Sequence, residues 1–534
     1  MSLFFKKSNH KTDNTSTYLE SKIVNELKNI QITTSHDENL QRLKKIFNKD
    51  LDFAIRKFKL FHQISGAIIY LYSLVNKETI RDIIRQLQDH HGMDENETAN
   101  ITHYIIENLL YYTDVKTVKD ESKIITSIVQ GKAIVLIDGI QEALVIDVVE
   151  KEKRGIEEPE TERVVRGPRD GFIEQLPINI ALLRYRLPIP EFRVEETLVG
   201  TRTQTKVAVC YIEDIVNPTL LKEVKMRIDA IHIDGILDSG YIEQFLEDIP
   251  KSPFPQLINT ERPNKVVGNL LEGRVAILMD GSPSALIAPA TFNHFYQTSE
   301  DYNEHWIIST FVRMFRIIAL IFSLIFSSIY VTIISFHPEL IPAKYVVAAS
   351  SGRHSIPFPL VFEVLLLELA MEVLREASVR MPQQVGGALS IVGVLVVGQA
   401  AVQAGFVSPI TVVIIGMSTI GSFAIPAYSA ANTFRMLRFV LIILAGSLGL
   451  LGLTLVLIVV VNHMLSLRSF GVPYMSPYAP LNIEGLKDSI IRAPFHKLKM
   501  RPSNIHPKDT TRVGEKVKDQ TNYNFLDEEE RENK

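Results

Sequence analysis

A run of 20 residues without a charged side chain, at 317–336, constrains the fold of this chain more than any other feature. An α-helix rises about 1.5 Å per residue, so this run would cover about 30 Å, the thickness of the hydrocarbon core of a membrane. Arg313 and Arg316 stand just before it, and basic residues favour the cytoplasmic side. We therefore predict a membrane-spanning helix that begins at the cytoplasmic face.

Further apolar runs predict an all-α transmembrane domain over residues 301–465. Three candidate spans follow the first one, near residues 385–404, 406–428 and 439–461. The break between the first two of these, near Gly405 and Pro409, predicts a tight helical hairpin. Four spans would return the chain to the cytoplasm, and a charged tail over 466–534 agrees with this. Within it, residues 487–518 hold nine Lys or Arg against three acidic residues.

Residues 360–377 form an apolar helix that carries charges. Glu368, Glu372 and Arg375 share one face at 100° per residue, and leucines occupy the other. One interpretation is an amphipathic or re-entrant helix at the membrane surface. The other is a helix inside the bundle whose acids face water or each other, because ionisable groups within a membrane tend to mark ion or substrate routes.

Two glutamines give the span over 385–404 a second feature. Gln399 and Gln403 are four residues apart, so they share a helical face with Val402 beside them. The amides could form hydrogen bonds between helices. Alternatively they could line a pore, in which a ring of Val402 side chains gates by dewetting.

The front half of the chain contains an internal repeat. Gly131 begins GKAIVLIDGIQEALVI and Gly273 begins GRVAILMDGSPSALIA. Each reads as an apolar strand, an Asp-Gly turn and a second apolar strand, which predicts a β-hairpin. Chance similarity of two hairpins is the alternative to duplication. We prefer duplication, which gives an α/β region of two similar subdomains. The predicted segments are a variable polar N-terminal arm at 1–45, subdomain 1 at 46–150, a linker at 151–165 and subdomain 2 at 166–300.

Other features of the sequence exclude several classes of function. The N-terminus lacks the apolar segment of a signal peptide, so the α/β region is expected in the cytoplasm. The net charge of −4, without a basic stripe, gives no indication of a nucleic-acid partner. A single cysteine, Cys210, excludes a disulfide framework. No P-loop, dinucleotide fingerprint, zinc-protease helix or nucleophile elbow is present. We expect no enzymatic activity, no cofactor and no metal.

Several long blocks resemble the A subunits of the spore-germination nutrient receptors, the GerA family. They include RGPRDGFIEQLPINIALLRYR from Arg166, IDGILDSGYIEQFLEDIPKSPFPQLINTERPNKVVGNLLEGRVAILMDGSPSALIAPATF from Ile233, and HPELIP from His337. The segments ELAMEVLREASVRMPQQVGGALSIVGVLVVGQAAVQAGFVSPI from Glu368 and SFAIPAY from Ser422 also match. The resemblance covers about residues 45–465.

The resemblance implies a role that composition and spacing do not give. It implies an A subunit in the spore inner membrane, working with a transporter-like B subunit that binds the germinant and a lipoprotein C subunit. It further implies that A subunits oligomerise into a nutrient-gated cation channel. For such a channel, the candidate pore residues are Gln399, Val402 and Gln403, with an acidic ring of Glu363, Glu368 and Glu372. The alternatives are an A-like accessory subunit of the dipicolinate-release complex, a non-conducting signalling scaffold and, more weakly, a secondary transporter.

Overall fold

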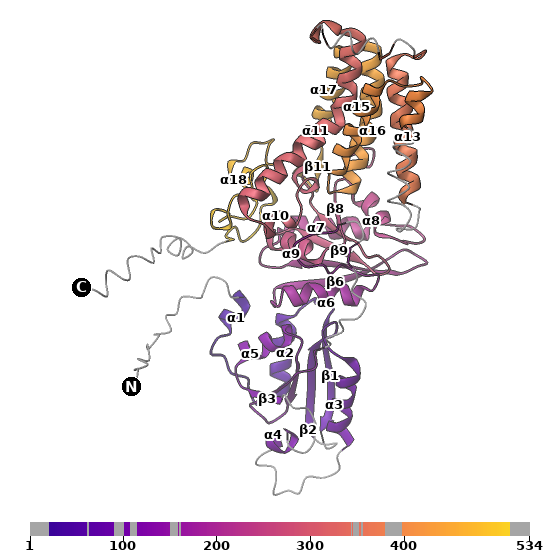
Figure 1. Ribbon diagram of the computed structural model, residues 1–534. Coiled ribbons are helices and arrows are strands. Elements are labelled where there is room, and N and C mark those ends of the chain that lie inside the picture. Colours follow the sequence, from indigo (N-terminus) through magenta and orange to yellow (C-terminus); the bar gives the residue numbers. More distant parts are fainter. Residues whose placement is uncertain are drawn as a thin grey trace, which may run out of the picture.

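The chain is elongated, with two α/β units stacked below a bundle of helices (Figure 1). The computed structural model describes residues 21–60, 64–89, 101–106, 115–149, 158–159, 162–342, 344, 352–353, 356–379 and 398–512. The expected division into an α/β region of two similar subdomains and a helical region with apolar helices is confirmed.

Subdomain 1 is a five-stranded antiparallel sheet in the order β1-β2-β4-β5-β3. Its strands are β1 (Phe53–Leu60), β2 (Ile64–Leu71), β3 (Val115–Val118), β4 (Ala133–Ile137) and β5 (Ala143–Ile146). Its helices are α1 (Lys22–Glu26), α2 (His36–Ile46), α3 (Lys77–Asp89), α4 (Ile101–Tyr104) and α5 (Glu121–Val129). Helices α2 and α5 bury their apolar faces on one side of the sheet and α3 on the other.

Subdomain 2 repeats this plan with the strand order β6-β7-β9-β10-β8. Its strands are β6 (Phe192–Val199), β7 (Thr205–Ile212), β8 (Ile258–Thr260), β9 (Val275–Met279) and β10 (Ala285–Ala288). Its helices are α6 (Leu176–Arg186), α7 (Pro218–Asp229), α8 (Ser239–Leu246) and α9 (Pro263–Glu272). Helices α6 and α9 cover one face, and α7 and α8 the other. Cys210 lies in the core between the sheet and helices α6 and α9, and burial raises the pKa of its thiol to about 12.

The repeat extends to individual hydrogen bonds. In each hairpin the turn aspartate accepts a bond from the first residue of a helix in its own subdomain: Asp138 from the N–H of His36 in α2 at 3.2 Å, and Asp280 from the N–H of Leu176 in α6 at 3.1 Å. Gly139 and Gly281 follow them at φ 83° and 88°, a conformation that favours glycine. Equal strand order and equal caps confirm the prediction of two similar subdomains and favour duplication over chance similarity of two hairpins.

A buried ion-pair cluster joins the two subdomains. The guanidinium of Arg184, on α6, lies 2.7 Å from Asp50 and 2.7 Å from Asp52 of subdomain 1. All three side chains are buried. The Leu51 N–H also donates to the Val194 carbonyl at 3.1 Å, across the same boundary.

The helical region continues directly from subdomain 2. Its main helices are α11 (Trp306–Phe336), α13 (Leu360–Val379), α15 (Pro409–Phe423), α16 (Tyr428–Leu448) and α17 (Leu450–Ser466). Short α10 (Glu300–Asn303) precedes them. Two of them, α11 and α16, are long and apolar enough to cross a membrane.

Two predicted spans have the wrong bounds. The span predicted over 439–461 is two helices, because the chain turns at Gly449, which has φ 60°. A Cβ there would lie 2.9 Å from the ring of Phe336, so the turn requires glycine. The span predicted over 406–428 is helical only from 409 to 423, since Ser408 caps its start and Pro426 stands before the next helix. The span over 385–404 lies mostly outside the described residues.

Three predicted segments need correction as well. Residues 21–45 are no separate arm, because Leu40 and Leu43 of α2 lie in the core of subdomain 1. The end of the predicted linker belongs to subdomain 2, where Glu162 pairs with Lys265 at 2.6 Å. The start of the predicted tail, residues 467–512, folds against subdomain 2, and its Ile505 is buried in that core. We call residues 467–512 the C-terminal segment.

Candidate functional site

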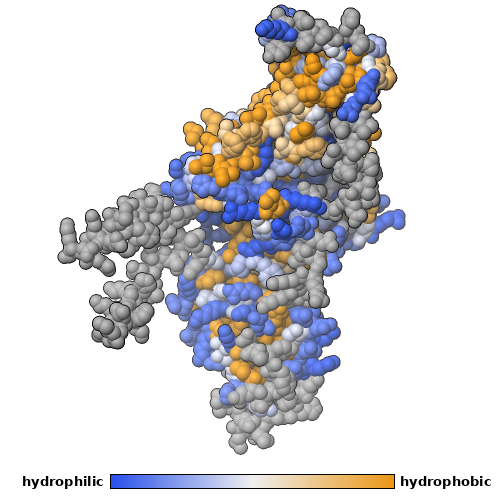
Figure 2. Space-filling model, viewed as in Figure 1, coloured by the Kyte–Doolittle hydropathy of each residue, from blue (hydrophilic) through white to orange (hydrophobic). Residues whose placement is uncertain are grey.

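The helical region places apolar side chains outside and charged ones inside. Leu369 and Val373 of α13 are 56% and 61% exposed, whereas Glu363 and Glu368 on the same helix are buried. Figure 2 shows apolar side chains covering the surface of this region, above a mostly hydrophilic surface of the subdomains. This pattern is the reverse of a soluble helix and suits a lipid or protein environment around the bundle. It favours the bundle interpretation of α13 over the surface one.

Helices α13 and α15 run side by side in the same direction. Near their starts, the Glu363 carboxylate contacts Ser408 and Thr411. Near their ends, Arg375 donates to the Ser422 hydroxyl at 3.1 Å and its guanidinium lies over the ring of Phe423. Helix α13 therefore begins at the end of the bundle away from the subdomains and returns toward them.

Glu363 is a fully buried carboxylate with polar partners on every side. It accepts bonds from the Ser408 N–H at 3.1 Å and the Thr411 hydroxyl at 3.2 Å. Arg353 lies 3.2 Å away and supplies the opposite charge. These contacts fix the loop before α13 to the start of α15.

Glu368 and Glu372 continue this series of charges along α13. Glu368 is 4% exposed, pairs with Arg438 of α16 at 3.0 Å and accepts a bond from Ser327 of α11 at 2.9 Å. Glu372 pairs with Arg375 at 3.3 Å and with Arg435 at 3.6 Å. We call the side chains Glu363, Glu368, Glu372, Arg353, Arg375, Arg435 and Arg438 the charge ladder.

The arginines of the ladder keep unused hydrogen-bond donors. Within the described part of the chain, Nε and Nη2 of Arg438 and Nε of Arg375 are buried without a hydrogen-bond partner. A buried donor of a charged group that lacks a hydrogen bond costs free energy in a low dielectric, so such atoms often occur at functional sites.

The three predicted glutamates do not form a ring of free acids within one chain, because each of them pairs with an arginine.

The predicted pore-wall residues lie elsewhere on the bundle. Residues 398–403 are helical, and both Gln399 and Gln403 are exposed on the surface of the single chain. Val402 is half-buried and packs against the cluster that holds Val364 and Leu367 of α13. Among the residues that the structure describes, neither amide forms a hydrogen bond with another helix.

A second buried charge cluster joins α11 to the rest of the molecule. Arg313 is fully buried, lies 3.1 Å from Asp301 of α10 and 3.1 Å from Asp488 of the C-terminal segment, and donates to the Ser489 carbonyl. Arg316 pairs with Asp301 at 2.6 Å. These contacts tie α11, subdomain 2 and the C-terminal segment together at one point, which we call the joint.

Comparison with known proteins identifies the relatives of this architecture. Residues 41–504 match the family described as Bacillus/Clostridium GerA spore germination protein. The chain belongs to the GerA family. Spore germination protein KA of Bacillus subtilis (strain 168) is 42% identical to it over 488 residues, 91% of this chain and 89% of that protein. The uncharacterized membrane protein YfkQ of the same organism is 39% identical over 476 residues, 88% of this chain and 91% of that protein.

A solved structure also resembles this GerA-family chain. The crystal structure of the N-terminal domain of the A subunit of the Bacillus megaterium spore germinant receptor GerK3 is 31% identical to it. The match covers 49% of this chain and 98% of that one, with a TM-score of 0.39. The predicted membership of the germinant-receptor A-subunit family is confirmed by the family match and the relatives.

Sequence reasoning missed part of the ladder in this GerA-family protein. It singled out the glutamates of α13 but not Arg353 or Arg438, which reach them from a loop and from α16. A signal was present, because an arginine next to an apolar run needs a partner inside a membrane. The joint was missed because Asp488 and Arg313 are 175 residues apart in sequence.

Proposed function

We propose that this chain is the A subunit of a nutrient germinant receptor in the spore inner membrane, and that copies of it oligomerise into a nutrient-gated cation channel. The observation that carries the proposal is the charge ladder inside a bundle whose outer surface is apolar. Charges buried in membrane helices are expensive and usually mark an ion route or a moving element. The membership of the chain in the GerA family supports a role for this arrangement in spore germination.

The topology of the bundle supports an even number of crossings. Helix α11 leaves subdomain 2, while α17 returns to it, because His463 near the end of α17 lies 2.8 Å from Ser252. Helices α13 and α15 run in parallel, so the residues between them must connect opposite ends of the bundle. A crossing by the predicted span over 385–404 would do this. The α/β region and the C-terminal segment would then share the cytoplasmic side.

In the proposed channel, several chains surround the pore. The exposed Gln399 and Gln403 would face the pore, with Val402 beside them as a narrow apolar point. The ladder would act as the bistable element, because its unused arginine donors can be satisfied by a second arrangement of the helices. A germinant-binding B subunit and a lipoprotein C subunit would bias this equilibrium.

The experiment is a conductance measurement on the purified full-length oligomer in a planar bilayer, alone and with its B and C partners. We expect monovalent cation current that a germinant increases. Gln403→Leu should lower this current severalfold, because it removes a polar contact for hydrated ions, while the matched control Val459→Leu on the exposed face of α17 should leave it unchanged.

Two alternative functions predict different results when the protein is purified and its conductance is measured. A non-conducting scaffold would bind its partners but give no current from any preparation. An A-like accessory subunit of the dipicolinate-release complex would copurify with that complex rather than with the B and C subunits.

A further inference from the structure

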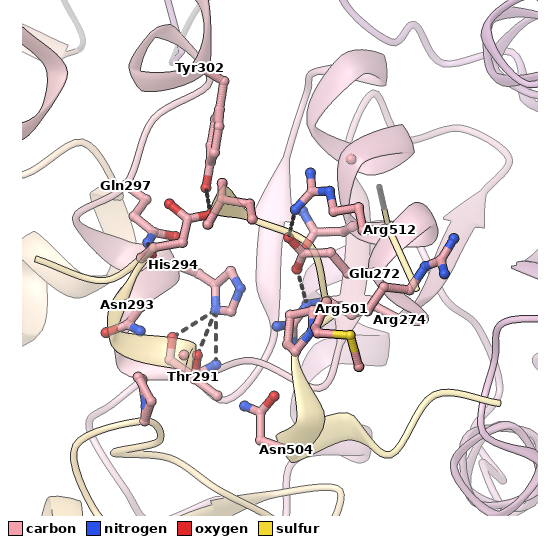
Figure 3. A pocket seen from close by; sticks show the side chains of 18 of the residues that line it. Glu272, Arg274, Thr291, Asn293, His294, Gln297, Tyr302, Arg501, Asn504 and Arg512 are labelled. Atoms are coloured by element: carbon pink, nitrogen blue, oxygen red, sulfur yellow. Dashed lines mark hydrogen bonds and ion pairs between the residues drawn. The ribbon is translucent and has the colours of Figure 1, made fainter. Parts of the chain in front are cut away.

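A cavity of about 560 Å³ lies between subdomain 2 and the C-terminal segment (Figure 3). Asn264 and Asn269 of α9, with Arg274 just beyond it, line one wall. Asn504, Arg501 and Arg512 of the C-terminal segment line the other. Cavities of roughly 300–1,000 Å³ with a few convergent polar groups are typical of small-molecule sites. This one lies outside the bundle and away from the charge ladder.

Three polar atoms in the cavity wall are buried without a hydrogen-bond partner among the described residues. All three are acceptors, the side-chain oxygens of Asn264, Asn269 and Asn504. Asn269 is only 9% exposed. Buried polar groups in folded proteins are nearly always paired, so a set of three lining one cavity indicates a missing partner that donates hydrogen bonds.

The cations in the cavity wall all have carboxylate partners. Glu272 serves two of them, at 3.5 Å from Arg274 and 3.6 Å from Arg512. The other two pairs are Glu162 with Lys265 at 2.6 Å and Asp509 with Arg501 at 3.1 Å. Burial, with Arg274 nearby, lowers the pKa of His294 well below its usual value, so that ring is neutral. Four cations against three carboxylates disfavour a cationic ligand, and the unpaired amide oxygens, which only accept hydrogen bonds, disfavour an anionic one.

We propose that this cavity binds a small, uncharged, hydroxyl-rich molecule, such as a polyol or a monosaccharide. Each hydroxyl can donate a hydrogen bond without carrying a charge, so one such molecule can satisfy the three amide oxygens. The rings of Tyr302 and Phe495, 6.5 Å apart, line the same cavity and offer an apolar surface to its C–H groups. The site is independent of the proposed channel function.

Binding here would act on the joint. The ligand would touch subdomain 2 through Asn269 and the C-terminal segment through Asn504, and so hold the two together. The same segment carries Asp488, which pairs with Arg313 of α11. Occupancy would thus stabilise the contact between α11 and the α/β region.

The test is thermal unfolding of the purified full-length protein with D-glucose, myo-inositol, glycerol, alanine or inorganic phosphate. We expect at least one of the three hydroxylated probes to raise Tm in a saturable way, and alanine and phosphate to have no such effect. Asn504→Leu and Asn269→Leu should each abolish this increase. They should also leave the Tm of the unliganded protein equal or higher, because each removes an unpaired buried oxygen.

The matched control is Asn259→Leu, an exposed asparagine on β8 outside the cavity, which should keep the full increase. If one leucine variant fails to fold, the other still decides the matter, since they come from opposite walls. A cavity that holds only water would give no saturable shift with any hydroxylated probe. That result, a shift with phosphate or alanine alone, or a shift that survives both leucine variants, would overturn the proposal.

Discussion

The two subdomains share a scaffold but differ in what is attached to it. Their sheets have the same strand order, and Asn39 and Asn179 occupy equivalent helix positions where each bonds the backbone just before its helix. Among the described residues, the cores of subdomain 1 contain no side chain of the helical region or of the C-terminal segment. Subdomain 2 packs against α11, α16 and α17 on one side and against the C-terminal segment on the other. Duplication thus preserved the scaffold, while the second copy became the centre of the molecule.

Equivalent helix positions in the two copies show how subdomain 2 came to differ from subdomain 1. Lys44 on α2 and Arg184 on α6 stand at the same place relative to the two asparagines. Lys44 is exposed, whereas Arg184 is buried between Asp50 and Asp52. The same helix position is therefore exposed to solvent in subdomain 1, whereas in subdomain 2 its side chain joins the two subdomains.

The largest expected effect comes from removing that link. Arg184→Met should cost about 3–5 kcal/mol, because it leaves two buried carboxylates without a counter-ion. The equivalent Lys44→Met should change the free energy of unfolding by less than about 0.5 kcal/mol, since Lys44 lies in solvent. Urea unfolding of the full-length protein in detergent measures both.

Replacing the aspartates as well sharpens the test. Arg184→Met combined with Asp50→Asn and Asp52→Asn should recover part of the lost stability, because no unpaired charge is then buried. Equal effects of the Arg184 and Lys44 variants would contradict the assignment of Arg184 as the link.

The second effect concerns the C-terminal segment, which has no counterpart on subdomain 1 in the described residues. Ile505 is 2% exposed in the core of subdomain 2. Ile505→Ala should cost about 2–4 kcal/mol through lost burial and a residual cavity. Hydrogen exchange should show faster opening in α7 and α8 but not in α2 or α3. Met500→Ala, at a half-exposed position of the same segment, serves as the control.

The third effect tests whether the copies are equivalent where they look alike. Asp138→Ala and Asp280→Ala should each cost about 1 kcal/mol, the usual value of a helix N-terminal cap. Bonds from His36 hold the pKa of Asp138 below its ordinary value, so its contribution is present at neutral pH and is lost as the pH falls below that ordinary value and through the lowered one. Thermal unfolding of the two variants, side by side at pH 7, measures the costs. A difference above about 1 kcal/mol between them would break the equivalence.

The sequence predicted the parts of this fold that depend on local pattern. The Asp-Gly turns and the apolar strands around them carry a short-range signal, and the structure has them close to the predicted places. The turn at Gly449 carries no such signal. Leucines flank it on both sides, so hydropathy alone joined two helices into one span.

Long-range partners could not be predicted from pattern. Arg438 reaches Glu368 from 70 positions away, and Asp488 reaches Arg313 from 175. Similarly, residues 467–512 look like a solvated tail because they contain many basic residues, although side chains such as Tyr474 and Ile505 are buried. Pairings of this kind depend on how the helices pack, and the local pattern of one amino-acid sequence does not give that packing.

The smallest expected effect separates the subdomains by pH. Burial, and secondarily Asp238, raises the pKa of Glu243 on α8 from its ordinary 4.5 to about 7. The folded chain therefore holds a proton there that the unfolded chain has released between about pH 4.5 and 7, so this group lowers stability as the pH rises through that range. Because Glu243 is partly exposed, Glu243→Gln should stabilise the protein at pH 8 by no more than about 1 kcal/mol. It should have no effect near pH 4.

The control, Glu78→Gln at an exposed position of subdomain 1, should leave the pH profile of Tm unchanged. Parallel profiles for the two variants between pH 4 and 8 would show that α8 gives subdomain 2 no pH response of its own.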